Sequence, residues 1–151
     1  MSILFDPIEL RGVTARNRVW LAPMCQYSAT AHDGKPTDWH LAHLGARAAG
    51  GFGVVIAEAT AVTPEGRISP DDTGLWSDDQ IEPWRRIADF VRGQGAVPAV
   101  QLAHAGRKAS TYPPAAAHSG SLPIDEGGWE TIGPSPEAFG QLAVPRSLTL
   151  D

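Results

Sequence analysis

Polar side chains that could do chemistry follow three apolar runs of this sequence. Cys25 and Tyr27 come just after the first run, Glu58 ends the second, and Gln101 lies near the end of the third. If the runs are strands of one parallel sheet, their carboxyl ends meet at the same edge, where α/β proteins bind ligands. The three clusters together therefore predict a ligand site at that edge.

Cys25 is the single cysteine of the chain, so this sequence can form neither an internal disulfide nor a cysteine metal cluster. A lone cysteine is often only a small buried apolar residue. Tyr27 would share one side of an extended chain with Cys25, and the two would offer a ligand a polarisable sulfur and a hydroxyl donor. No Ser-His-Asp order or activated-cysteine signature accompanies them, which argues against covalent catalysis.

The histidines allow a functional and a structural interpretation. His40 and His43 are three residues apart in a predicted helix, but the His-Glu-x-x-His pattern of zinc enzymes is absent. We therefore favour packing of this helix face on the sheet. His104 and Arg107 lie beside a small-residue turn, and a loop that closes on a ligand and a purely structural turn fit them equally well.

The hydrophobic pattern alternates strand and helix along the chain. We expect strands at 18–23, 53–58 and 96–102, and helices at 37–49 and 79–92. Asp78 or Asp79 can cap the second helix. This order predicts right-handed β-α-β crossovers in a parallel sheet. A dinucleotide fingerprint is excluded, because Gly50-Gly51-Phe52-Gly53 precedes a strand instead of following one.

The two ends of the chain are expected to differ from this core. Residues 1–18 predict a small hairpin or lid ahead of the first strand. Residues 107–151 are rich in proline and glycine and predict a loop of roughly 45 residues, a length that is usually functional. The last residues, 147–151, have the composition of a helix start.

Composition and charge narrow the function classes. Twelve Lys and Arg stand against 17 Asp and Glu, for a formal net charge of -5. Nucleic acid and anionic membrane as main partners require a basic surface, so both are excluded. No apolar run is long enough to span a membrane, and the first residues lack the pattern of a secretory signal. We therefore expect a cytoplasmic location.

Several motifs together resemble one known family. They are, in chain order, Phe5-Asp6-Pro7, Asn17-Arg18, Ala22-Pro23-Met24-Cys25-Gln26-Tyr27, Glu58-Ala59-Thr60-Ala61-Val62, Pro64-Glu65-Gly66-Arg67-Ile68, Trp76-Ser77-Asp78 and Gln101-Leu102-Ala103-His104-Ala105-Gly106-Arg107-Lys108-Ala109. In this combination the chain resembles the Old Yellow Enzyme family, and more narrowly its thermophilic-like branch of xenobiotic reductases and NADPH dehydrogenases. The resemblance runs in order over essentially the whole chain.

The resemblance implies an α/β fold, a (β/α)8 TIM barrel that binds FMN at the carboxyl ends of its strands. It implies an ene-reductase, in which NADPH reduces the flavin and flavin N5 passes hydride to an activated alkene. The segment along the isoalloxazine corresponds to Ala22, Pro23, Met24 and Cys25. Cys25 would tune the flavin near N5 and O4 without attacking substrate, the backbone of Ala59 would meet the ring, the side chain of Gln101 would pair with the pyrimidine edge, and Tyr27 would line the substrate pocket.

A complete barrel of this kind needs about 250 residues and eight strands, whereas three strands are predicted here. We therefore expect residues 1–151 to be the N-terminal part of a single FMN-binding barrel domain, a split or truncated chain that needs a complementary C-terminal fragment for activity. The resemblance also implies a homo-oligomer when complete. The alternative is a catalytically inactive half-barrel that docks on a partner by sheet completion.

Overall fold

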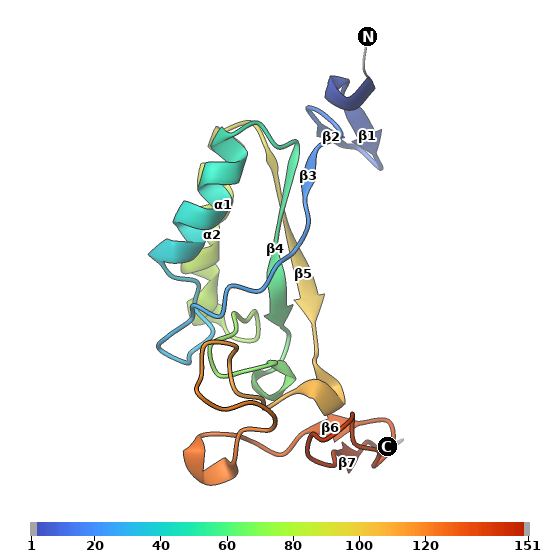
Figure 1. Cartoon of the computed structure of the whole chain (residues 1–151). Coiled ribbons are helices and arrows are strands. Elements are labelled where there is room, and N and C mark those ends of the chain that lie inside the picture. Colours follow the sequence, from blue (N-terminus) through green and yellow to red (C-terminus); the bar gives the residue numbers. More distant parts are fainter. Residues whose placement is uncertain (1–2, 150–151) are drawn as a thin grey trace.

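A three-stranded parallel sheet and two helices form the centre of the molecule. The computed structural model describes residues 3–149. The strands, in their spatial order, are β3 (Trp20–Leu21), β4 (Val54–Ala61) and β5 (Val97–Ala103), and the helices are α1 (Asp38–Ala49) and α2 (Ile81–Gly93). Both helices lie on the same face of the sheet, and the other face is not covered by a described helix (Figure 1). The predicted β-α-β order is confirmed.

A hairpin precedes the sheet, as expected for the first 18 residues. β1 (Ile8–Leu10) pairs antiparallel with β2 (Val13–Ala15). Arg11 and Gly12 between them have φ of 48° and 82°, and positive φ at both turn positions is typical of a type I′ hairpin turn. A 3-10 turn, η1 (Ile3–Phe5), comes before the hairpin.

β3 is shorter than the strand predicted at 18–23, because only Trp20 and Leu21 pair with β4. Pro23 has no N–H to donate to a strand ladder. The Gln26 N–H is donated to the carboxylate of Glu58 instead, with N···Oε1 at 3.0 Å. The chain therefore leaves the sheet after Leu21 and continues as an irregular segment toward α1.

A β-bulge at Glu58 carries β4 past its predicted end. Ala57 pairs with Val100 and Ala59 pairs with Gln101, so Ala57 and Glu58 together oppose a single residue of β5. In such a bulge the ladder is interrupted locally and then resumes. This is why β4 continues to pair with β5 beyond residue 58, where the predicted strand ended.

α1 begins directly after Thr37, as predicted, whereas the start of α2 differs from prediction. Neither Asp78 nor Asp79 is the N-cap: Ser77 precedes a 3-10 turn, η3 (Asp78–Gln80), that leads into α2. The Gln80 carboxamide oxygen accepts the Ser77 N–H at 3.1 Å. The Asp79 carboxylate is paired with Lys35 at 2.8 Å, which takes it away from a capping role.

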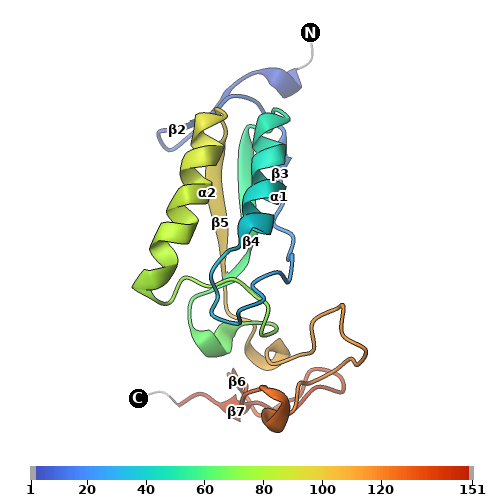
Figure 2. The ribbon, with the colours of Figure 1, turned by 90° about the vertical axis from the view of Figure 1, so that its left-hand side faces the viewer.

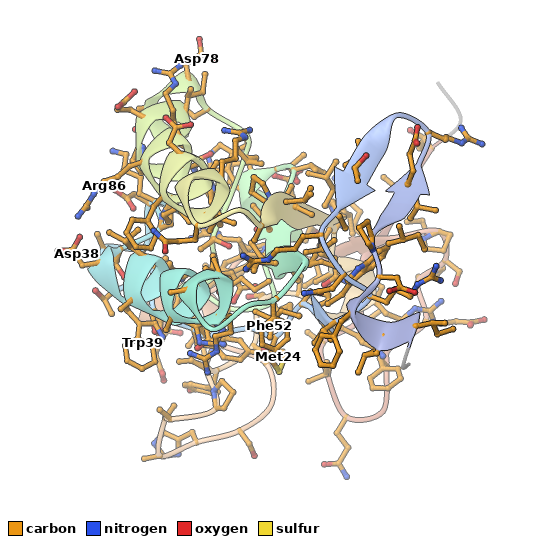
Figure 3. The ribbon with its side chains drawn as sticks, turned by 90° about the horizontal axis from the view of Figure 1, so that it is seen from above. Met24, Asp38, Trp39, Phe52, Asp78 and Arg86 are labelled. Carbon is orange, nitrogen blue, oxygen red and sulfur yellow. The ribbon has the colours of Figure 1, made fainter. Side chains whose placement is uncertain are left out.

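The core lies between the sheet and the two helices. Its buried apolar members are Leu21, Leu44, Ala48, Val55, Ala57, Ile87, Val91 and Ala96. At the rim, Arg86 of α2 and Asp38 of α1 form an exposed ion pair at 2.7 Å (Figure 3). None of the helices within residues 3–149 is long and apolar enough to cross a membrane.

The segment from His104 onward lies beyond the carboxyl ends of β4 and β5 (Figure 2). Its regular elements are two 3-10 turns, η4 (Gly106–Lys108) and η5 (Ile124–Glu126), and the short parallel pair β6 (Ile132–Gly133) and β7 (Arg146–Ser147). The helix start expected at 147–151 is wrong at Ser147, which pairs in β7. Residues 150 and 151 lie outside the described residues.

One arginine ties this long segment to the β4–α2 connection, which begins with a 3-10 turn, η2 (Pro64–Gly66). The Arg67 guanidinium lies over the rings of Trp76 and Trp129, 5.3 Å and 4.9 Å from their centroids. It also donates to the backbone carbonyl of His32 at 2.9 Å. Stacking on two aromatic faces and donation to a carbonyl suit a planar guanidinium.

Candidate functional site

Three of the predicted site residues meet at the carboxyl end of β4. Cys25 Sγ accepts a hydrogen bond from the backbone N–H of Ala59 and another from the hydroxyl of Tyr27. The chain is not extended at Tyr27, whose φ is 49°, so a left-handed turn, and not strand geometry, directs its hydroxyl toward Cys25. The thiol, the hydroxyl and the β4 backbone thus form one cluster.

The surroundings of this cluster disfavour ionisation. Burial and the nearby Asp72 carboxylate raise the pKa of the Cys25 thiol, and the hydrogen bonds from Ala59 and Tyr27 oppose the rise only in part. Burial, followed by the interaction with Cys25, raises the pKa of Tyr27 to about 12. Near neutral pH the cluster therefore presents a neutral thiol and a hydroxyl, and not a nucleophilic thiolate.

A buried carboxylate lies close behind the cluster. Asp72 is 3% exposed, and it accepts hydrogen bonds from the Ser69 hydroxyl at 2.8 Å and from the Ile68 N–H at 2.6 Å. Burial raises the pKa of Asp72, and the hydrogen bonds from Ser69 and Ile68 lower it. Its bonds fix the loop after β4 beside the thiol.

Gln101 lies on the face of the sheet that no described helix covers. Its neighbour Val100 packs against the helix-facing core, and successive side chains of a strand point to opposite faces. Ala59 is its register partner on β4. The Gln101 side chain is exposed and makes no hydrogen bond to a described residue. Its amide donor and acceptor are therefore both free for a ligand.

The predicted segment of Ala22, Pro23 and Met24 joins β3 to this cluster. Ala22 is exposed, and Met24 is 48% exposed. The Gln26 carboxamide donates to the Met24 carbonyl at 2.7 Å and accepts from the Trp39 indole at 3.1 Å. Trp39 projects from α1 on the side of the molecule where Met24 lies (Figure 3). The segment is thus held through Gln26 while its apolar side chains stay accessible.

The histidines have structural surroundings. His40 and His43 are buried on α1, as expected for a helix face packed on the sheet, and burial lowers the pKa of His43. His104 Nδ1 accepts the Gly106 N–H at 3.1 Å, and Arg107 donates to a loop carbonyl. Among residues 3–149, no group of three or more His, Cys, Asp and Glu side chains is arranged to hold a metal ion.

Two buried carboxylates lie at this site. The sequence placed Glu58 in one of the polar clusters at the strand ends without an individual role, and it did not single out Asp72. A signal existed for Glu58, because a charged residue in an otherwise apolar strand is seldom fully buried without a partner. No local pattern distinguishes Asp72 from Asp71, which instead forms an ion pair with His32 at 3.0 Å. The different surroundings of Asp71 and Asp72 become apparent only in the folded loop.

This arrangement is suited to binding rather than to covalent attack. The free amide of Gln101 both donates and accepts, as the edge of a planar heterocycle requires. The exposed apolar side chains of Ala22 and Met24 can cover the face of such a ring. The Cys25 thiol accepts hydrogen bonds from two donors, the Ala59 N–H and the Tyr27 hydroxyl, and is not paired with a general base. The residues present therefore fit a planar ligand whose edge carries both donors and acceptors.

Comparison with known proteins shows the family to which this chain is similar. The family model described as NADH:flavin oxidoreductase / NADH oxidase matches residues 3–136. An NADH:flavin oxidoreductase of Gibberella zeae is 47% identical over 150 residues, which cover 97% of this chain and 36% of that protein. A structure of an old yellow enzyme homologue from Zymomonas mobilis matches with a TM-score of 0.76 at 32% identity, over 99% of this chain and 40% of that one.

A structure of morphinone reductase in complex with tetrahydroNAD has a TM-score of 0.79 at 25% identity, over 99% of this chain and 42% of that one. This chain therefore spans about two fifths of the length of the matched structures and about one third of the Gibberella zeae relative. These neighbours are TIM barrels of the Old Yellow Enzyme type. The prediction that this chain supplies the hairpin, the first three strands and the long loop of such a barrel is confirmed.

Proposed function

Because this chain belongs to the NADH:flavin oxidoreductase / NADH oxidase family, we propose that it forms one wall of the FMN site of an ene-reductase. When bound, FMN would supply hydride transfer from NADPH to the C=C bond of an enone or nitroalkene. The residues of this chain bind and orient the isoalloxazine and set its electrostatic surroundings. As in other cofactor enzymes, the protein contributes position and polarity to chemistry that belongs to the cofactor.

The observation that carries this proposal is the free amide of Gln101 beside Ala59 on the open face of the sheet. A flavin pyrimidine edge has alternating donors and acceptors, and a carboxamide can meet both. The segment Ala22, Pro23 and Met24 offers an accessible surface for the ring face. We propose contact of the Ala59 backbone with the same ring.

Cys25 and Tyr27 have separate roles in this proposal. Cys25 is a polarisable thiol, kept neutral by burial and by Asp72, which tunes the flavin without bonding to substrate. Tyr27, whose pKa is raised to about 12, keeps its proton throughout the working pH range. Its single O–H is donated to Cys25, so at the substrate side of the pocket it offers its ring and an oxygen that can accept a hydrogen bond.

We further propose that residues 1–151 act as the N-terminal part of one barrel domain, completed by a C-terminal barrel fragment. In the described structure β5 pairs with β4 along one edge, and its other edge is open. An apolar groove beside this strand is lined by Trp84, Ile87, Val91 and Val100. The matched structures are longer than this chain, which supports the proposal that a further part of the barrel covers both features. The completed barrel would be a cytoplasmic homo-oligomer.

The test is reconstitution. This chain is mixed with the part of the Gibberella zeae relative that it does not match, and FMN is added. We expect colourless protein for this chain alone, and bound-flavin absorbance with NADPH-dependent enone reduction for the mixture. The oxidation rates of NADPH and NADH are compared in the same mixture, and a preference for NADH would contradict the proposed reductant.

Two results would contradict the proposal in other ways. Reductase activity of the 151-residue chain alone would show that completion is not required. A stable complex of the two fragments that binds no flavin would favour the alternative, an inactive half-barrel that docks by sheet completion.

A further inference from the structure

Glu58 is a buried carboxylate that the proposed flavin contacts do not use. Its side chain is 2% exposed. One oxygen accepts the backbone N–H of Gln26 at 3.0 Å, and the other lies 3.5 Å from Nε2 of His40, whose side chain is fully buried. Burying a carboxylate costs free energy. The two polar groups that Glu58 faces therefore suggest that its position has a role of its own.

The hydrogen bonds of His40 fix which of its nitrogens carries the proton. His40 Nδ1 accepts the backbone N–H of Thr37 at 2.8 Å. A nitrogen that accepts cannot carry a proton, so in the neutral ring the proton is on Nε2 and is directed toward Glu58. Nε2 has no hydrogen-bond partner within the described residues, which leaves the Glu58 carboxylate as the polar group that it faces.

The bulge in β4 explains why Glu58 points toward His40. Ala57 belongs to the helix-facing core, and in a regular strand the next side chain would point to the opposite face. Because Ala57 and Glu58 together oppose Val100, Glu58 stays on the helix-facing side and Ala59 returns to the open face. The carboxylate thus lies under the segment that carries Cys25.

Few hydrogen bonds tie this segment to the rest of the molecule, and one of them runs from the Trp39 indole to the Gln26 side chain. β3 stops pairing at Leu21, and the chain from there to Tyr27 has no strand partner. The bond from the Gln26 N–H to Glu58 holds the backbone of the segment at Gln26. The bond from the Ala59 N–H to Cys25 Sγ holds the segment at Cys25. Both bonds lead to the same bulge of β4.

We infer that Glu58, oriented by His40, is a positioning residue that clamps segment 22–27, the proposed flavin-facing surface, onto the bulge of β4. The inference rests on the proposed function for its consequence at the flavin, although the clamp itself can be measured without FMN. Glu58 acts through Gln26 and Cys25 and is not assigned a contact with flavin or substrate.

The experiment uses three variants of the chain. Glu58→Gln keeps the shape but turns one oxygen into an N–H donor, which then meets the Nε2–H of His40. His40→Asn keeps an amide oxygen that can accept the Thr37 N–H and removes the Nε2–H that faces Glu58. Glu82→Gln is the matched control, because the Glu82 side chain is 75% exposed on α2 and forms an ion pair with Arg85 of the same helix.

Two measurements are made on each variant, well below its melting temperature. The first is the rate at which Cys25, the single thiol, reacts with an aromatic disulfide reagent in the chain without FMN. The second is the FMN dissociation constant of the barrel completed by the second fragment. Thermal melting is recorded in parallel, because a purely structural role would lower the melting temperature without changing the thiol rate of the folded chain.

For Glu58→Gln we expect the thiol to react about fivefold faster, since the oxygen that still accepts the Gln26 N–H is then neutral and the side chain is no longer oriented by His40, a loss of about 1 kcal/mol. Removal of the nearby negative charge acts in the same direction, because it also lowers the pKa of Cys25. The FMN dissociation constant should rise by a similar factor. His40→Asn should produce a smaller change of the same sign, and Glu82→Gln should match the wild type.

If Glu58→Gln leaves both the thiol rate and the FMN dissociation constant equal to those of Glu82→Gln, the inference is wrong. If Glu58→Gln does not fold, His40→Asn decides, and an unchanged thiol rate in that variant overturns the role of His40 and Glu58 as a clamp. Failure of the wild-type completed barrel to bind FMN would contradict the proposed function instead, while the thiol rates would still decide on the clamp.

Discussion

Replacing Tyr27 with phenylalanine removes the hydroxyl that donates to Cys25 Sγ and keeps the aromatic ring. That hydrogen bond lowers the pKa of the thiol, whereas burial and the Asp72 carboxylate raise it by more. Its loss therefore raises the pKa of Cys25, so that at a given pH below the pKa a smaller fraction is ionised. Because the thiolate is the reactive form, we expect Tyr27→Phe to slow the reaction of Cys25 with a disulfide reagent.

The size of the effect follows from one hydrogen bond to a charged sulfur. Such a bond contributes about 1.5–3 kcal/mol, and the lower end applies because Cys25 and Tyr27 are both partly exposed. About 1.4 kcal/mol is a tenfold change in the thiolate fraction. A thiolate of higher pKa is also more nucleophilic, which offsets a little under half of this change on a logarithmic scale. The net expectation is a rate about threefold to fivefold lower near neutral pH.

The assay measures this rate from pH 6 to 10, and the whole signal comes from Cys25 because no other cysteine is present. Tyr112→Phe is the matched control, since Tyr112 is the other tyrosine and its hydroxyl donates to Glu126 at 2.7 Å, in the loop beyond β5. A rate for Tyr27→Phe that equals or exceeds that of Tyr112→Phe, or a pH profile displaced to lower pH, would refute the reasoning.

Three further predictions concern the proposed site and its scaffold. Gln101→Ala should raise the FMN dissociation constant of the completed barrel about tenfold through the loss of two neutral hydrogen bonds, whereas the exposed Gln141→Ala should not; equal affinities would remove Gln101 from the site. Cys25→Ser should shift the flavin reduction potential without abolishing turnover, and complete inactivity with flavin still bound would contradict a tuning role. Arg67→Ala should lower the free energy of unfolding by about 2 kcal/mol, and thus the melting temperature by about 4–8 °C, because it removes a guanidinium stacked between two tryptophans; an unchanged melting curve would show that this contact does not anchor the long loop.

The elements predicted well from the sequence are those whose signal is local. The periodicity of the apolar residues within one segment is enough to predict which of its faces is buried. This holds for the strands predicted at 53–58 and 96–102 and for the helices predicted at 37–49 and 79–92. The predicted ends of these elements were less accurate where a residue distant in the sequence determines the hydrogen bonding. The Gln26 N–H goes to Glu58 and not to a ladder, and Asp79 pairs with Lys35 instead of capping α2.

The candidate site divides in the same way. That Cys25, Ala59 and Gln101 belong to one edge could be predicted, because the carboxyl ends of parallel strands coincide. The position of the Asp72 carboxylate behind these residues could not be predicted. Asp72 influences the thiol only because the loop after β4 folds back, and the left-handed φ of Tyr27 is not encoded by a glycine or asparagine that would signal it.

A single extra residue in β4 links the scaffold to the site. Without the bulge, strict alternation would place Glu58 on the open face and turn Ala59 toward the helices, so a carboxylate would lie next to Gln101 where the proposed flavin edge binds. With the bulge, the carboxylate goes inward to the Gln26 N–H and to His40, and the small Ala59 stays outside. Reduced flavin is anionic. The inward turn of Glu58 therefore removes a like charge from the proposed binding face, and the carboxylate instead holds the segment that carries Cys25. The irregularity in the strand therefore keeps a carboxylate away from the face on which we propose that FMN binds.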